Sequence, residues 1–191
     1  MVYRLKPYEI ASCITLFLLM LALVGGMMCS VIFNPSPLVL MERSRLKSTS
    51  SASIIARIDD GDNTKYEIGE LIQRGNTESN LNALHAALDA PENPRPYVYA
   101  IFILYKIGDE DAEEKLRELI LDLPDIDSGL LGAMSTILSR YLGPEDGVFL
   151  PALEEVASTG PERIVNLVVV AIEHINDPDY FARWRVIEVL D

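Results

Sequence analysis

Histidine and cysteine, which often carry acid–base or nucleophilic chemistry near neutral pH, are scarce in this chain. His85 and His174 are the two histidines, and both fall on predicted helices. His174 follows Glu173 near the end of an apolar helix, where a cation suits the negative end of the helix dipole, so we expect a structural role for it. Cys13 and Cys29 both lie in one apolar segment. Residues 30–191 therefore have no disulfide and no thiolate metal site.

Carboxylates are abundant, and a pair of them can act as acid and base where a cleft separates their pKa values. Here the clusters, such as Asp109–Asp111 and Glu154-Glu155, fall at predicted helix N-termini or on predicted exposed faces. Asp59–Asn63 resembles a calcium loop, but Thr64 or Lys65 stands at the sixth position, where an EF-hand needs glycine. There is no HExxH, P-loop or dinucleotide-binding glycine motif. The sequence predicts no enzyme activity, no metal and no cofactor.

The net charge restricts the kind of molecule that this chain can bind. The chain has 29 acidic and 16 basic residues, and without Arg4, Lys6 and Glu9, which precede the apolar segment, 28 acidic and 14 basic residues remain. This net charge of −14 argues against binding nucleic acid or an anionic membrane through a basic face. It is compatible with a basic protein partner, and equally with a surface that only keeps the domain soluble.

A charge-free apolar segment runs from Ile10 to Phe33. As a helix its 24 residues would be about 36 Å long, slightly more than a hydrocarbon core of about 30 Å. We interpret it as an uncleaved transmembrane helix. The alternatives are a cleaved signal peptide, for which the segment is long and its cleavage site poor, and lipidation at Cys29, for which Met28 is too large.

The predicted domain order follows from this segment. Residues 1–9 are a cytoplasmic tail, 10–33 the transmembrane helix, 34–58 a juxtamembrane linker and 59–191 the folded domain. Arg4 and Lys6 lie closer to the apolar segment than the basic residues of the linker. The positive-inside rule then places the N-terminus in the cytoplasm and the domain outside, as in a single-pass protein of a bacterial inner membrane.

The folded domain repeats one turn four times, at intervals of 33 to 35 residues. The turns are Gly75-Asn76, Gly108-Asp109, Gly143-Pro144 and Asn176-Asp177. Glycine, and less easily asparagine, can adopt the left-handed conformation that ends a helix, and Asp, Asn or Pro then opens the next one. A helical repeat of this period predicts an all-α fold, a short α-solenoid of about four hairpins. The predicted pairs are 64–74 with 78–89, 96–107 with 110–122, 127–142 with 145–158, and 161–175 with 178–190.

Residues Lys106–Ala112, followed by Leu116, Leu119 and Ile120, resemble a HEAT-like repeat of the bacterial kind also found in phycobilisome-lyase-type proteins. A similar turn follows at Leu142–Glu145, and a weaker copy at Ile175–Pro178. The resemblance covers about residues 64–190. It implies protein binding along the surface of a helical scaffold, while lyase activity does not follow from a shared scaffold.

Two groups of residues are candidates for the partner surface. The second helices of the hairpins carry Glu114, Glu118, Glu154 and Glu155, which the resemblance places on the inner face. The last helix carries Trp184 and Arg185, and aromatics beside arginine are typical of interface anchors. We expect a membrane-anchored scaffold or adaptor for a protein partner. The alternatives are an accessory subunit of a membrane complex and a lyase-type enzyme that uses the solenoid groove.

Overall fold

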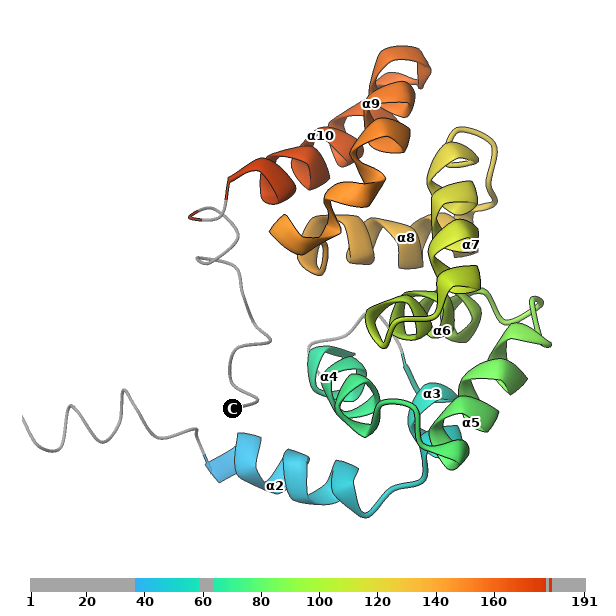
Figure 1. The fold of residues 1–191 in the computed structure, drawn as a ribbon, viewed down its shortest axis with the longest axis vertical. Coiled ribbons are helices and arrows are strands. Elements are labelled where there is room, and N and C mark those ends of the chain that lie inside the picture. Colours follow the sequence, from blue (N-terminus) through green and yellow to red (C-terminus); the bar gives the residue numbers. More distant parts are fainter. Residues whose placement is uncertain (1–36, 59–63, 178, 180–191) are drawn as a thin grey trace, which may run out of the picture. The chain divides into compact units, whose positions relative to one another are not determined.

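The computed structural model describes residues 37–58, 64–177 and 179, which Figure 1 draws as a coloured ribbon. Every regular element in these residues is a helix, which confirms the all-α prediction. The chain divides into two compact units, Met1–Glu42 and Arg43–Asp191, and helix α2 (Pro37–Lys47) begins in the first and ends in the second. The predicted transmembrane helix 10–33 and nearly all of the predicted last helix 178–190 lie outside the described residues. Within the described ranges, no helix has the length and apolar character needed to cross a membrane.

The helices of the second unit are α3 (Ser51–Ile55), α4 (Thr64–Arg74), α5 (Glu78–Leu88), α6 (Pro94–Lys106), α7 (Glu110–Leu121), α8 (Ser128–Arg140), the 3-10 helix η1 (Pro144–Phe149), α9 (Leu150–Thr159) and α10 (Glu162–Asn176). From α4 onward they begin and end close to the predicted positions, except that the predicted helix 145–158 is divided into η1 and α9. The apolar run Tyr97–Ile107 belongs to helix α6 and its C-cap, as the repeat predicts, although its aromatic and β-branched residues also suit a strand.

The four repeated turns have different backbone conformations. Gly75 and Gly108 have φ angles of +54° and +91°, the left-handed conformation expected after a helix. Gly143 is instead extended, with φ −143° and ψ −172°, and Asn176 is the last residue of α10. Prolines explain the difference, because the residue before a proline is restricted to extended conformations. Pro144 imposes this on Gly143, and Pro178 on Asp177, which has φ −119° and ψ 94°.

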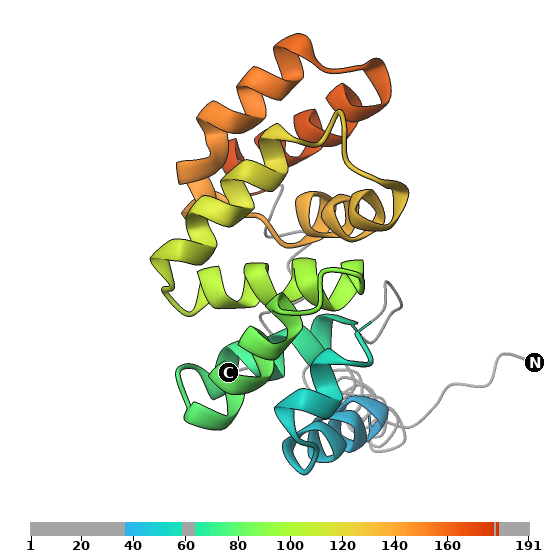
Figure 2. The same cartoon turned by 90° about the vertical axis from the view of Figure 1, so that its right-hand side faces the viewer.

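Alternate helices pack against each other. Helix α6 contacts α4 on one side and α8 on the other, and α8 in turn contacts α10. Helix α7 contacts α9, and Figure 2 shows these two side by side. Because α6 also contacts α3, α5 and α7, the seven residues from Val98 to Leu104 are all buried. A helix that is surrounded in this way must be apolar on every side.

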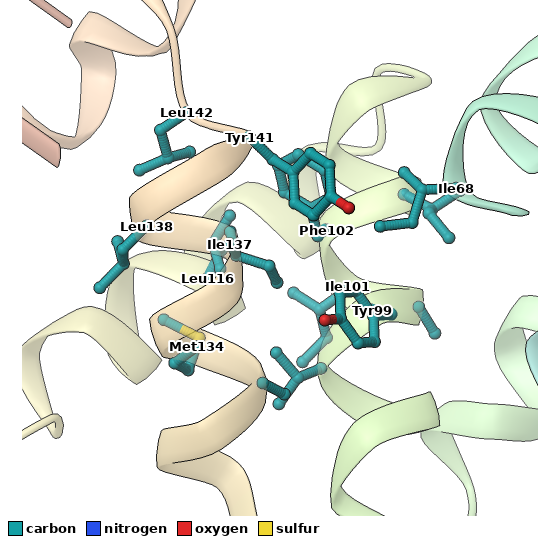
Figure 3. Packing of buried hydrophobic residues seen from close by; sticks show 14 of the residues in the cluster. Ile68, Tyr99, Ile101, Phe102, Leu116, Met134, Ile137, Leu138, Tyr141 and Leu142 are labelled. Atoms are coloured by element: carbon teal, nitrogen blue, oxygen red, sulfur yellow. The ribbon is translucent and has the colours of Figure 1, made fainter. Parts of the chain in front are cut away.

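The interface between α6 and α8 contains two of the largest buried side chains, Tyr99 and Phe102. Figure 3 shows Tyr99 and Phe102 of α6 facing Met134 and Ile137 of α8, and all four are fully buried. The rings of Phe102 and Tyr141 are tilted, with centroids 6.0 Å apart. This interface joins the second predicted hairpin to the third.

The predicted linker, residues 34–58, overlaps the second compact unit, which begins at Arg43. Leu46, Ile54, Ile55 and Ile58 are buried and join the same apolar cluster as the helices that follow. The Ser/Thr-rich composition suggests a flexible segment, but Ser50 is the N-cap of α3, and its hydroxyl accepts a hydrogen bond from the Ser53 N–H. The Ser/Thr-rich stretch therefore contains the start of helix α3.

Candidate functional site

The four predicted partner-binding glutamates lie on two helices that contact each other, α7 and α9. Glu114 and Glu118 are one turn apart on α7 and exposed, whereas Leu116 and Ile120 of the same helix are buried. Glu154 and Glu155 are exposed on α9, whose Leu153 and Val156 are buried. We call these four residues the acidic face.

The carboxylates of the acidic face are only partly neutralised. Glu114, with 61 % of its side chain exposed, pairs with Arg117 on the same helix, and Arg117 also bonds Glu113 at 2.9 Å. Among the described residues, no ion pair involves Glu118, Glu154 or Glu155. Exposed charges of this kind are available to a partner and contribute little to folding.

The other two predicted binding residues, Trp184 and Arg185, lie outside the described residues. The structure therefore describes the acidic half of the predicted surface.

Helix α6 and the start of η1 meet in a second polar cluster, which the sequence did not predict. Asp146 is fully buried. Its Oδ1 accepts hydrogen bonds from the Lys106 ammonium at 2.5 Å and the Tyr105 hydroxyl at 2.8 Å. Its Oδ2 accepts from the Gly143 N–H at 2.7 Å, and Glu145 lies 3.4 Å from the Lys106 nitrogen. Lys106 is the one charged residue of the apolar run Tyr97–Ile107, and this was the signal in the sequence for a buried carboxylate partner.

This cluster is better suited to holding two elements together than to catalysis. Burial, together with the neighbouring Asp146, raises the pKa of Tyr105, so the phenol stays protonated and remains a donor. The Lys106 ammonium, 14 % exposed, is held by a carboxylate and is not a free nucleophile. The rings of Tyr105 and Phe149 also pack edge-on, with their centroids 4.9 Å apart. The cluster thus fastens α6 to the turn that opens the third predicted hairpin.

A third polar cluster surrounds Arg74 at the end of α4. Its guanidinium donates at 2.7 Å to the backbone carbonyls of both Leu46 and Thr49, at 2.9 Å to the Ser51 hydroxyl and at 3.0 Å to Glu70. A planar guanidinium donates several hydrogen bonds in fixed directions at once, whereas the ammonium of a lysine has no such fixed fork of donors. Arg74 thereby holds the connection between α2 and α3 against α4.

The two histidines do not meet in a shared site. His85 is exposed on α5, whereas His174 is buried on α10. Burial lowers the pKa of His174, an effect that nearby Glu173 opposes, so the imidazole is neutral at pH 7 rather than the expected cation. Within residues 37–58 and 64–177, no three His, Cys, Asp or Glu side chains are grouped so as to hold a metal ion.

Comparison of the chain with family models, with curated proteins and with solved structures gives no match. Its function must be inferred from its own residues and their geometry.

Proposed function

We propose that the second unit is a short α-solenoid of HEAT-like hairpins. The supporting observation is the contact between alternate helices: α4, α6, α8 and α10 follow one another in one row, and α7 and α9 are neighbours in a second row. Two rows of helices, each in contact with the next of its kind, are what stacked helical hairpins produce.

The turn between α6 and α7 gives local support for the HEAT-like resemblance. Gly108 takes the left-handed conformation, and the Asp109 carboxylate then accepts a hydrogen bond from the Ala112 N–H at 2.9 Å. Ala112 is buried at the start of the new helix, within the apolar cluster of its neighbours. Each residue of the Gly-Asp-x-x-Ala pattern therefore has a distinct physical task.

On this scaffold, the acidic face is the surface that binds a protein partner. Its four carboxylates project from two adjacent helices, and three of them have no ion-pair partner among the described residues. A partner with a basic surface would gain complementary charge there, which accelerates association and selects against acidic competitors. The chain would then act as a scaffold or adaptor and not as an enzyme.

The proposed location is a membrane. It rests on the charge-free segment 10–33, which is long enough to span a bilayer, and on Arg4 and Lys6 before it. We propose an uncleaved single-pass anchor with the N-terminus in the cytoplasm and the repeat domain on the other side.

Co-purification of the full-length chain from membranes in mild detergent tests this function. The test variant reverses the acidic face: Glu114→Lys, Glu118→Lys, Glu154→Lys and Glu155→Lys. The control variant makes the same change in net charge at exposed acids on other elements: Glu92→Lys, Asp125→Lys, Glu173→Lys and Asp179→Lys. A basic protein should co-purify with the wild type and the control but not with the test variant, and added salt should weaken its binding.

Two results would overturn the proposal. Equal retention of the partner by both variants would show that the acidic face is not the contact surface. Recovery of the wild-type chain in the soluble fraction, without detergent, would remove the membrane anchor and leave the scaffold hypothesis to stand alone.

A further inference from the structure

A hollow of about 320 Å³ lies between helices α8 and α10. Its lining comes from the first turns of both helices, Ser128, Leu131, Gly132 and Ser135 of α8 and Arg163, Ile164 and Leu167 of α10. The volume is near the lower end of the range of about 300–1,000 Å³ typical of small-ligand pockets. We call it the α8–α10 hollow.

The hollow exists because small residues line one side of α8. Ser128, Gly132 and Ser135 recur at spacings of four and three, so they share one side of the helix. The opposite side of α8 carries the buried Met134 and Ile137. The hollow therefore opens away from the core that α8 shares with α6, while Leu131, Ile164 and Leu167 supply an apolar wall.

Arg163 is the charged residue of this lining. It is exposed, and its guanidinium makes no ion pair with any residue that the structure describes. Glu162 precedes it in the chain, but consecutive residues of a helix point about 100° apart, so the two side chains diverge. In a chain with a net charge of −13, this places an uncompensated cation beside an apolar recess.

We propose that the α8–α10 hollow binds a short peptide segment of a partner protein in which an apolar side chain is followed by a carboxylate. The apolar side chain fills the recess against Leu131, Ile164 and Leu167, and the carboxylate pairs with Arg163. The serine hydroxyls of Ser128 and Ser135 supply hydrogen bonds to the peptide backbone. Charge complementarity selects this occupant, because arginine recognises carboxylates with two parallel hydrogen bonds.

This surface is distinct from the acidic face. The acidic face lies on α7 and α9 and selects basic partners, whereas the hollow lies between α8 and α10 and selects acidic ones. The two proposals do not depend on each other.

Amide chemical shifts of the ¹⁵N-labelled full-length chain in mild detergent test the hollow with defined probes. The probes are N-acetyl-Leu-Glu amide, N-acetyl-Leu-Gln amide and N-acetyl-Leu-Lys amide. With the wild type, the Glu probe should shift the amides of Gly132, Ser135 and Ile164 and bind about tenfold more tightly than the neutral Gln probe, since one charge-assisted contact separates them.

Three variants make the outcome decisive. Arg163→Glu should reverse the preference, so that the Lys probe is now the tightest at the same amides. Arg140→Glu is the matched control, since Arg140 is exposed on α8 and outside the lining, and it should leave the preference unchanged. Ser135→Leu fills the recess and should abolish binding of all three probes, while the remaining amide shifts report that the fold is intact.

Other outcomes overturn the proposal. Equal affinity for the Glu and Gln probes would exclude Arg163 as a recognition residue. Shifts confined to helices α3 to α6, or no saturable shift at millimolar probe, would show that the hollow binds no peptide of this class, and neither result bears on the acidic face.

Discussion

Lys106 and Asp146 show how much one buried contact can contribute to this domain. They lie 40 residues apart in the sequence, yet the ammonium and the carboxylate are 2.5 Å apart. A buried charge without a partner is costly, whereas a pair that is fully hydrogen-bonded is tolerated. Asp146 has all its contacts within the domain: Lys106, Tyr105 and the Gly143 N–H.

Removing either partner should therefore destabilise the fold. Lys106→Met leaves the Asp146 carboxylate without its counter-ion, and Asp146→Ala leaves Lys106 with the more distant Glu145. We expect each to lower the free energy of unfolding by about 3–5 kcal/mol. The double variant should cost less than the sum, by about 0.5–3 kcal/mol, because the interaction can only be lost once. Urea denaturation measures all three values.

Glu145→Gln provides the control for this cycle. Its carboxylate is 54 % exposed and 3.4 Å from the lysine nitrogen, so we expect a change of less than about 1 kcal/mol. Strictly additive effects of the two single substitutions would show that Lys106 and Asp146 do not stabilise each other.

At the scale of helices, the sequence predicted what depends on local patterns. The helices α4 to α10 follow from apolar spacing and from the breaks at glycine and proline. The polar contacts escaped prediction because they join residues far apart in the chain, as Arg74 and Leu46 show. Helix periodicity alone predicts that Glu114, Glu118, Glu154 and Glu155 are exposed, as they are in the structure. The α8–α10 hollow could not be predicted from the sequence, because its lining depends on how α8 and α10 pack.

The contacts of Arg74 make a prediction about helices α2 and α3. Arg74→Ala removes the hydrogen bonds to the Leu46 and Thr49 carbonyls and to the Ser51 hydroxyl. Bonds to a charged group are worth about 1.5–3 kcal/mol each, so local opening should increase by at least tenfold. Trypsin should then cleave more rapidly after Lys47, which is exposed, while the helices from α5 onward stay protected.

The matched control for this experiment is Arg140→Ala. Arg140 is exposed at the end of α8 and makes no ion pair with the described residues, so its removal should leave cleavage after Lys47 at the wild-type rate. Cleavage that is unchanged in Arg74→Ala would mean that burial of Leu46 and Ile54 alone holds this segment in place.

At the scale of the whole molecule, one apolar cluster extends from Leu46 to Ile175, but most helices contact only their near neighbours. Helix α6 is the exception, since it contacts α3, α4, α5, α7 and α8. A domain stabilised by neighbours should lose stability locally when it is damaged near one end. A compact bundle with a shared core would instead lose stability everywhere at once.

Hydrogen exchange of two core variants distinguishes these architectures. Leu153 of α9 and Leu71 of α4 are both fully buried, so substitution by alanine should cost about 2–5 kcal/mol in either case. If the helices form stacked hairpins, Leu153→Ala should accelerate amide exchange in α9 and α10 by at least about tenfold and leave α4 and α5 unchanged. Leu71→Ala should do the reverse, with faster exchange in α3 to α5 and little change in α10. Equal acceleration of amide exchange in all helices of both variants would contradict the α-solenoid. It would show that the domain unfolds as a single cooperative unit, in which the repeated turns only end and begin helices.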